Sequence, residues 1–495
     1  MKKPFVWLLV VFALTLALRL FFAFKAPYFT DDHAYFVMRQ VMHIRATGLP
    51  LYNDALSYGG RLNIFLPLYY YALAVFTFFM PVNQVLLIIP NIFASCLVFI
   101  VYLITLFLTK SNRTALFTSA ISSVIPIFAS DTIASASPFT LAVPLMFLVV
   151  YLLMRQDSAM PFIIFLVLLA LTDAITIVLV LGFVLYIIFA RFESISLERR
   201  QTELTLFSVF FIVWSYFLIF KKPFLSYGAL AIKQNIPQEL LVKYFRPVTV
   251  LSSINLIGLI PILIGIFILY RYLFSTKDKQ IYLLTGIAVS SGILLWAQLI
   301  SSSVGLMILG VILVLFVGKF LKVFSDYVDQ TRFVSARPYF ILGAILLFVA
   351  TSLMPTMFYV TEEMKRGFTS DEVQAMAWMS NNTEKSDMIL ANLREGNLVT
   401  ALAKRPVMMD TNFLLIRDVD KRLADLDTIF STKSEIEAVE LLTRYKVNYI
   451  YLSDYSRLQY KKTSLPYTDD YNCFQLVYDK GVQIFKSTCV LVSQK

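Results

Sequence analysis

Long apolar runs, each near the 20 residues that cross a bilayer, alternate with short polar stretches over the first 360 residues. The first run, Phe5–Phe24, follows Lys2 and Lys3 and has no small-residue cleavage site after it, so we interpret it as a retained anchor. The same reasoning predicts spans at residues 85–108, 115–130, 139–154, 161–171, 174–189, 204–220, 251–270, 281–300, 304–320 and 339–359. The pattern indicates a polytopic α-helical membrane protein with about 11 transmembrane helices.

Residues 63–80 are also apolar, and whether they cross the membrane decides the side of every later loop. Pro67 and the run Tyr69–Tyr71 suit an interfacial segment, because tyrosine prefers the headgroup boundary. If the segment only dips into the outer leaflet, the basic clusters all face the cytoplasm, as the positive-inside bias expects: residues 110–113, 191–200, 271–279 and 319–337. We therefore expect a cytoplasmic amino terminus, and a first external loop at residues 25–82 that contains interfacial helices.

The remaining region, residues 361–495, has the pattern of a folded domain and should lie outside the membrane. Thr369–Glu372 reads as a capping box that opens a helix through Trp378, because its hydroxyl and carboxylate can bind the free amides of a helix start. Apolar runs at 388–391, 407–409 and 447–452 alternate with a helical pattern at 434–445. We predict a transmembrane domain at residues 1–360 and a small extracytoplasmic α/β domain at residues 361–495.

Charge separates these two regions. The chain is 58% hydrophobic with a net charge of +11, yet residues 361–495 hold 18 Lys and Arg against 19 Asp and Glu, which leaves 25 against 13 for the membrane region. The basic residues therefore belong to membrane loops, and we expect membrane lipids but no nucleic acid as partners. Cys473 and Cys489 flank a predicted hairpin and could pair in an oxidising compartment, but two buried thiols would give the same pattern.

With this topology, acidic residues collect at one side of the membrane: Asp31, Asp32, His33 beside them, Asp54, Asp131 and Asp173. Charge beside hydrocarbon is costly, so such residues are candidates for function. The alternatives are structural: Asp31 and Asp32 could be a solvated helix start, and Asp131 and Asp173 could cap the helices that follow them.

Basic residues also occur on this side, where the positive-inside bias would not place them. A lipid phosphate would explain them, and we predict that it binds Arg61, Lys221, Lys222 and Arg246. Attraction to headgroups without catalysis is the alternative for each. Arg19, near the outer end of the first span, could either snorkel to the interface or reach a phosphate.

A carboxylate beside a phosphate site suggests a reaction. A sugar joined through its anomeric carbon to a lipid phosphate already has a good leaving group, so the missing element is a base. A carboxylate that takes the proton of an acceptor hydroxyl contributes typically 10² to 10⁴ in rate. A nearby cation stabilises the charge that develops on the departing phosphate.

The segment Asp31-Asp32-His33-Ala34-Tyr35 resembles the acidic first-loop motif of the GT-C superfamily of polyprenyl-phosphate-dependent glycosyltransferases, and Pro67-Leu68-Tyr69-Tyr70 is similar to the segment that closes that loop. The resemblance implies an inverting hexosyl- or pentosyltransferase of the cell membrane, with a glycan, lipid or protein acceptor. It also implies that Asp31 is the base and Asp32 its neighbour, assisting or binding.

Further roles follow from the same resemblance. Tyr35 and His33 would bind substrate, and Asp131 would be the second-loop acid. A divalent cation, Mg²⁺ or Mn²⁺, would be held by Asp31 and Asp131 if the enzyme uses one. The double-acid spacing and the Trp-Trp-Asp-Tyr-Gly motif of oligosaccharyltransferases are missing, which argues against an asparagine-linked oligosaccharide transferase and leaves metal dependence open.

Three other functions fit a multi-span protein of this kind. A transporter or flippase of lipid-linked sugars usually puts polar residues at the bilayer midplane, whereas the charges here cluster at outer helix ends. A polysaccharide polymerase or ligase would also have an external site. In a receptor-like protein the acid pair would be incidental.

Overall fold

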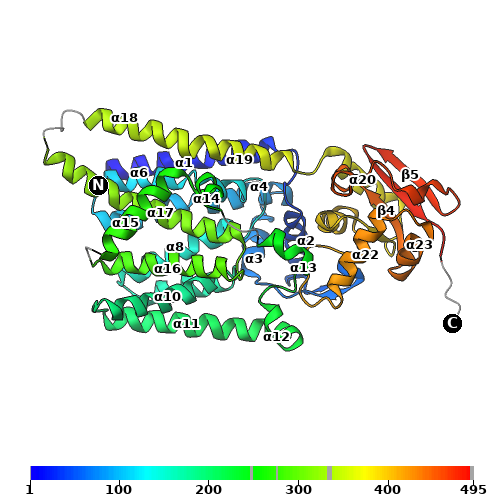
Figure 1. Cartoon of the computed structure of the whole chain (residues 1–495), viewed down its shortest axis with the longest axis horizontal. Coiled ribbons are helices and arrows are strands. Elements are labelled where there is room, and N and C mark those ends of the chain that lie inside the picture. Colours follow the sequence, from blue (N-terminus) through cyan, green and yellow to red (C-terminus); the bar gives the residue numbers. More distant parts are fainter. Residues whose placement is uncertain (1, 246–248, 275–276, 332–336, 491–495) are drawn as a thin grey trace. The chain divides into compact units, whose positions relative to one another are not determined.

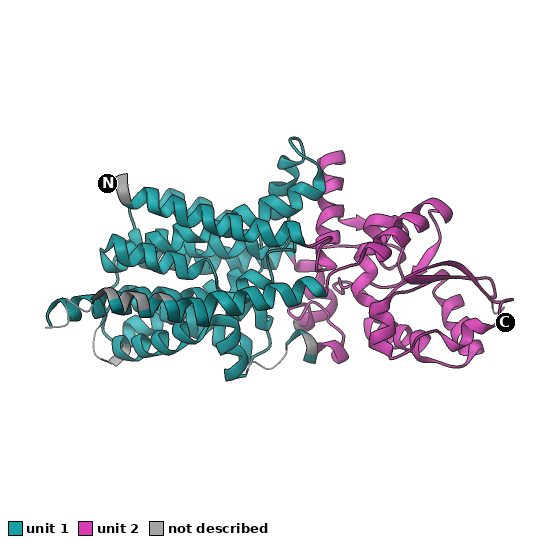
Figure 2. Cartoon of the chain, turned by 90° about the horizontal axis from the view of Figure 1, so that it is seen from above, with its two compact units in different colours: residues 1–25, 66–219, 242–365 teal, residues 26–65, 220–241, 366–495 magenta. Residues whose placement is uncertain are grey.

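The computed structural model describes residues 2–245, 249–274, 277–331 and 337–490, drawn in Figure 1. These residues form two compact units, coloured in Figure 2. Unit 1 comprises residues 1–25, 66–219 and 242–365, and unit 2 comprises residues 26–65, 220–241 and 366–495. The cut near residue 365 lies close to the predicted domain boundary, but two earlier loops group with the C-terminal region.

Unit 1 is helical. Its elements are α1 (Lys2–Lys25), α3 (Leu68–Phe76), α4 (Val82–Ser95), α5 (Leu97–Thr109), α6 (Asn112–Ser122), α7 (Pro126–Ser130), α8 (Phe139–Arg155), α9 (Ala159–Ala170), α10 (Thr176–Phe192), α11 (Arg199–Ile219), α14 (Val250–Ile257), α15 (Leu259–Phe274), α16 (Lys279–Trp296), α17 (Ser302–Asp329), α18 (Arg337–Phe348), a π-helical turn (Val349–Leu353) and α19 (Met354–Lys365).

Helices lie at every predicted span. Among the described residues, five helical stretches are long and apolar enough to cross a membrane: 4–25, 82–109, 199–219, 279–296 and 302–329. The helices α8, α9 and α10 are apolar but shorter. The chain is therefore a polytopic helical membrane protein, and the number 11 remains a prediction.

Two predicted spans are not continuous helices. The span at 251–270 breaks at Gly258, where α14 and α15 meet at 107°, because this glycine adopts φ +109° and ends the first helix. The span at 115–130 breaks into α6 and α7 ahead of Pro126, whose ring cannot continue a helix from the preceding turn. The length of the apolar runs predicted an unbroken helix at both places, and this prediction was wrong.

The interfacial segment is short in the structure. The helix α3 has nine residues, which rise about 14 Å at 1.5 Å per residue. A bilayer core is about 30 Å thick, so this helix cannot cross it alone. Its length agrees with the predicted interfacial role.

Small residues allow close packing inside unit 1. A Cβ atom on Gly182 of α10 would lie 2.9 Å from Ile287 Cα, and one on Gly286 of α16 would lie 2.7 Å from Gly182 O. The two backbones therefore approach more closely than larger residues would permit, as is usual between helices in a membrane.

Unit 2 mixes helices and strands. Its elements are α2 (His33–Thr47), β1 (Asn53–Asp54), a 3₁₀ turn (Ser57–Gly59), β2 (Arg61–Leu62), α12 (Lys221–Tyr227), a second 3₁₀ turn (Gly228–Ala231), α13 (Gln238–Tyr244, which begins here), α20 (Ser370–Asn382), β3 (Met388–Leu390), η5 (Leu393–Glu395), α21 (Gly396–Leu398), a π-helical turn (Val399–Ala403), α22 (Val419–Ser431), α23 (Glu435–Arg444), β4 (Val447–Leu452), α24 (Asp454–Tyr460), a third 3₁₀ turn (Pro466–Asp469), β5 (Phe474–Lys480) and β6 (Val482–Ser487).

The C-terminal region has the predicted α/β character. Four strands form a sheet in the order β3-β4-β6-β5, with β3 parallel to β4 and the other pairs antiparallel. The capping box at Thr369 and Glu372 is present at the start of α20. Of the predicted strand at 407–409, only a single bridge between Val407 and Ile389 forms.

The hairpin between the two last cysteines is also present. Strands β5 and β6 turn at Gly481, and Cys473 is joined to Cys489 by a disulfide. The structure thus selects the paired form from the two that the sequence left open.

Candidate active site

Asp31 and Asp32 have opposite environments within unit 2. Asp31 is exposed, whereas Asp32 is buried with 3% of its surface accessible. The helix α2 begins directly after Asp32, yet the Asp32 side chain makes no bond to the free amides of that helix. The pair is therefore not an ordinary solvated helix start.

The Asp32 carboxylate is held by the C-terminal region instead. It accepts hydrogen bonds from the backbone N–H of Asn397 (3.3 Å), the Nδ2 amide of Asn397 (2.7 Å) and the backbone N–H of Leu398 (2.9 Å). Burial raises the pKa of Asp32 well above its ordinary value, although these donors act in the opposite direction. Three N–H donors therefore hold the carboxylate of Asp32, which lies between Asp31 and the first residue of α2.

The two predicted substrate-binding residues beside the pair have aromatic neighbours. The Tyr35 ring is buried between Phe29 and Phe368, with centroid distances of 5.7 and 5.4 Å. His33 is half-buried, and its ring lies 5.5 Å from that of Phe36. Burial lowers the pKa of His33 while the charge of Asp31 raises it, so these two residues interact electrostatically.

A second contact ties residues 26–65, the part of the predicted first external loop that belongs to unit 2 and is called the first loop below, to the C-terminal region. Ser57 Oγ donates to Asp410 Oδ2 at 2.5 Å, and the Tyr58 hydroxyl donates to Asp410 O at 2.6 Å. Arg61, predicted to bind phosphate, donates to the carbonyl oxygens of Asn412 and Leu414. The first loop and residues 410–414 therefore form one folded surface.

Two charges on the first loop neutralise each other. Arg39 makes a bidentate ion pair with Asp54, with N–O distances of 2.6 and 2.9 Å, and the Asp54 side chain is 1% exposed. Neither charge was predicted to be paired, because local sequence gives no signal for a partner 15 residues away in a loop. The pair removes Asp54 from the candidate acids.

The other predicted basic residues differ in how they are held. Lys221 and Lys222 are exposed at the start of α12 in unit 2, and Arg246 lies outside the described residues. The loop that carries the lysines is anchored by Asn235, whose Nδ2 donates to Phe413 O at 3.1 Å and Ile416 O at 2.8 Å.

Asp131 and Asp173 belong to unit 1. Asp173 Oδ1 accepts the backbone N–H of Ile175 at 2.8 Å in the turn ahead of α10, but the N-cap residue of this helix is Ile175 and no side chain caps it. Asp131 is half-buried after α7 and is followed by seven residues before α8, so it does not cap that helix. Ser130 Oγ donates to Asp131 Oδ1 at 3.1 Å.

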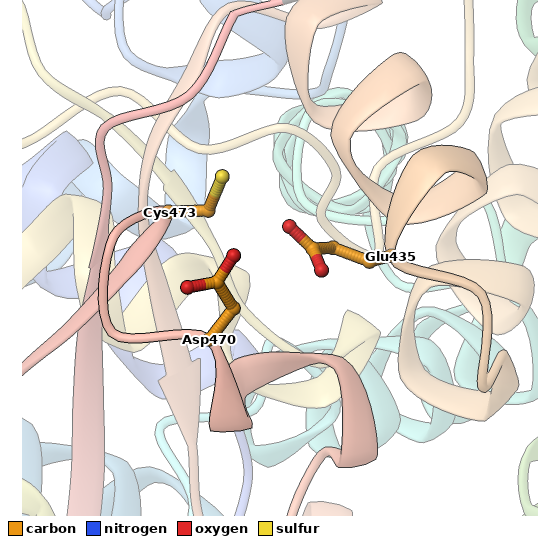
Figure 3. Close-up of side chains that lie close together, drawn as sticks. All are labelled: Glu435, Asp470 and Cys473. Atoms are coloured by element: carbon orange, nitrogen blue, oxygen red, sulfur yellow. The ribbon is translucent and has the colours of Figure 1, made fainter.

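One group of potential metal ligands occurs elsewhere among the described residues. Glu435, Asp470 and Cys473 lie together, with their ligand atoms within 4.8 Å of one another (Figure 3). The sulfur of Cys473 is bonded to Cys489, so a thiolate is not available and two carboxylates remain. Two ligands are fewer than the three or four that a zinc site usually has.

The sequence could not reveal the partners of Asp32 and Asp410. Asp32 and Asn397 are 365 residues apart, and Ser57 and Asp410 are 353 residues apart. Only folding of the first loop against the C-terminal region brings these atoms together.

No protein-family model and no curated protein matches the chain. Solved structures do match. The oligosaccharyltransferase AglB of Archaeoglobus fulgidus, in complex with an inhibitory peptide and a dolichol-phosphate, has a TM-score of 0.66 at 13% identity, covering 91% of this chain and 70% of that protein. ArnT of Cupriavidus metallidurans, bound to undecaprenyl phosphate, has a TM-score of 0.54 at 11% identity, covering 99% of both chains.

A further structure of the A. fulgidus oligosaccharyltransferase, tethered to an acceptor peptide, has a TM-score of 0.62 at 14% identity and covers 91% of this chain and 69% of that one. The chain therefore has the fold of GT-C glycosyltransferases, and the predicted resemblance is confirmed at this level. The match extends to oligosaccharyltransferases although their Trp-Trp-Asp-Tyr-Gly motif is missing here.

Proposed function

We propose that this chain, which has the GT-C fold, transfers one sugar from a polyprenyl-phosphate carrier to an acceptor on the outer face of the membrane, with inversion at the anomeric carbon. The observation that carries the proposal is the contrast between Asp31 and Asp32. A buried carboxylate that accepts three hydrogen bonds anchors the start of α2, and the carboxylate next to it is exposed.

In the proposed reaction, Asp31 takes the proton of an acceptor hydroxyl. The acceptor oxygen forms its bond to the anomeric carbon on the face opposite the phosphate, and the bond between that carbon and the phosphate oxygen breaks. The electron pair leaves with the polyprenyl phosphate. Asp32 does not move a proton in this scheme, because its oxygens already accept three N–H donors.

Charge on the departing phosphate needs a cationic partner. Lys221 and Lys222 suit this role because their side chains are exposed on a loop of the same unit as Asp31. The Nη1 and Nη2 atoms of Arg61 donate to Asn412 O and Leu414 O, so Arg61 would have to bind phosphate through N–H groups that are not directed at these two carbonyl oxygens. Arg246 completes the predicted set.

A divalent cation would supply further charge neutralisation when bound. Asp31 and Asp131 offer the carboxylate oxygens that Mg²⁺ and Mn²⁺ prefer. We propose these two residues as the ligands of a cation, if the enzyme uses one.

We further propose a cell-membrane location with a cytoplasmic amino terminus and an extracytoplasmic C-terminal region. The Cys473–Cys489 disulfide supports this side, because disulfides persist in oxidising compartments. The acceptor would be a glycan, lipid or protein exposed there.

The test uses the purified full chain with radiolabelled hexose or pentose on undecaprenyl phosphate or dolichol phosphate, and with membranes as the source of acceptor. We expect Asp31→Asn to lower transfer by about 10² to 10⁴, the contribution of a general base. Asp479→Asn, an equivalent change at an exposed hairpin position, should retain full transfer. Full transfer by Asp31→Asn would reject Asp31 as the base.

The Asp32→Asn variant separates the two roles. Its amide nitrogen would replace one of the two carboxylate oxygens, so at least one of the three N–H donors would lose its acceptor, and each donor left unpaired costs about 1–3 kcal/mol. We therefore expect Asp32→Asn to lower the melting temperature, while Asp31→Asn leaves it unchanged. Absence of transfer with every carrier would favour a transporter or flippase, and chelation by EDTA in the same assay reports on the cation.

A further inference from the structure

Arg19 is a buried cation inside the first membrane helix. It lies in α1 of unit 1 with 2% of its surface exposed. Its Nε donates to Asn91 Oδ1 at 3.0 Å and its Nη2 donates to Thr132 Oγ1 at 2.6 Å, while its guanidinium carbon lies 5.4 Å from the centroid of the Phe128 ring. The side chain therefore points into the helix bundle and does not snorkel.

These partners are all neutral. Among the described residues, no carboxylate forms an ion pair with Arg19. A charged side chain within a membrane helix is costly and is rare without a function. A neutral residue of similar size could fill this space, so helix packing alone does not account for an arginine.

Asn91 of α4 extends the contact. Its Oδ1 accepts from Arg19, and its Nδ2 donates to Leu87 O at 2.7 Å and to Ile133 O at 2.9 Å. Every polar atom of the Asn91 side chain is thus used. Arg19 and Asn91 act together and bind two consecutive residues, Thr132 and Ile133.

Those two residues directly follow Asp131. Thr132 Oγ1 accepts from Arg19 and donates to Phe128 O, so its hydroxyl is fixed on both sides. Asp131 O accepts from Ser135 Oγ at 2.6 Å. The segment is therefore held at positions 131 and 133 through backbone carbonyl oxygens and at position 132 through the Thr132 hydroxyl. Arg19 of α1 and Asn91 of α4 supply the contacts at positions 132 and 133.

We infer that Arg19 and Asn91 are positioning residues, which hold the second-loop carboxylate of Asp131 in its working geometry. The inference rests on the proposed function, in which Asp131 contributes to transfer. The role of Arg19 is then to position a carboxylate more than 100 residues away in sequence, and not to bind a lipid headgroup or a phosphate.

Two variants of the full chain test the inference. Arg19→Gln removes the fork that reaches both partners, and Thr132→Val removes only the acceptor hydroxyl while keeping the side-chain shape. Both should lower kcat for sugar transfer by about 10- to 100-fold, the effect of a small displacement of a reacting group. The KM for the lipid-phosphate sugar should change little, because the carrier is not bound by Arg19.

The control is Thr15→Val. Thr15 lies one turn earlier in the same helix, is 6% exposed, and donates only to Val11 O, so it shares the burial but not the contact with the second loop. This variant should keep the native kcat. Restoration of transfer by Thr132→Ser, which keeps the hydroxyl, would agree with the assigned contact.

A double-mutant comparison separates positioning from stability. If Arg19 acts through Asp131, Arg19→Gln should cause no further loss in an Asp131→Asn background. An equal fold-loss in both backgrounds would overturn the inference, because Arg19 would then act through the stability of the helix bundle.

Hydrogen exchange gives a readout that needs no activity. Amides of residues 132–137 should exchange faster in Arg19→Gln and Thr132→Val than in the native chain or in Thr15→Val. Unchanged exchange would overturn the anchoring. If the native chain transfers no sugar from any carrier, the proposed function fails while this exchange measurement still reports on the anchor.

Discussion

Asp31 and Asp32 are the same residue type at consecutive positions, and the fold gives them different chemistry. Asp32 is buried against three N–H groups of Asn397 and Leu398, whereas Asp31 is exposed. A sequence motif names both carboxylates but cannot say which is anchored. At the scale of single residues, the environment of each carboxylate therefore depends on partners that come from a distant part of the chain.

Glu395 shows the same principle and leads to a prediction on pH. It is 1% exposed, and its carboxylate accepts hydrogen bonds from Asn392 N–H and from the hydroxyls of Ser453 and Ser456. Burial raises its pKa from 4.5 to about 8. The folded chain therefore binds a proton that the unfolded chain releases near pH 4.5, so this residue's contribution to stability falls as pH rises from about 4.5 to about 8.

We expect Glu395→Gln, which mimics the protonated acid, to weaken this pH dependence. Each pKa unit of the shift corresponds to about 1.4 kcal/mol. Melting temperatures at pH 5 and pH 8.5 are the measurement, and the variant should gain on the native chain at the higher pH. A native chain and variant that respond equally to pH would show that Glu395 is ionised in the folded state.

At the scale of elements, sequence patterns predicted correctly those helix starts and strands that depend on interactions between residues close in sequence. The capping box at the start of α20 and the strand β4 lie where hydroxyl spacing and apolar residues predicted them. The breaks at Gly258 and before Pro126 were missed, because hydropathy measures transfer into lipid and does not measure backbone direction.

Gly258 provides the prediction at this scale. A Cβ atom there would lie 3.1 Å from Ser352 Oγ and 3.4 Å from Thr351 O, in a backbone conformation with φ +109°. We expect Gly258→Ala to reduce the stability of unit 1 by about 1–3 kcal/mol, as measured by thermal unfolding in detergent.

Gly292 of α16 is the matched control. A Cβ atom at this position would meet nothing within 4 Å, and alanine favours a helix by up to about 1 kcal/mol over glycine. Gly292→Ala should thus be neutral or stabilising. Equal effects of the two substitutions would contradict a conformational role for Gly258.

For the whole molecule, apolar helices establish that the chain crosses a membrane but not which side each loop faces. The side was predicted from loop charges and from treating residues 63–80 as interfacial. The nine-residue length of α3 agrees with that treatment.

Cysteine labelling tests the topology. In a background with Cys96 replaced by serine, Lys110→Cys and Ser370→Cys introduce thiols at exposed positions of unit 1 and unit 2. An impermeant maleimide should label Ser370→Cys from outside intact cells and Lys110→Cys only after permeabilisation. Labelling of both from one side would mean that residues 63–80 cross the membrane.

Hydropathy, charge bias and turn chemistry are local properties, and they determined the membrane class, the C-terminal α/β region and the candidate acids. The tertiary structure decided which partners these acids and their neighbours have: Asp32 contacts Asn397 and Leu398, Asp54 contacts Arg39, and the two residues after Asp131 contact Arg19 and Asn91. It also joined Cys473 to Cys489. The physical reason is that hydrogen bonds and ion pairs act over a few ångströms in space, whereas these partners are separated by up to hundreds of positions in sequence.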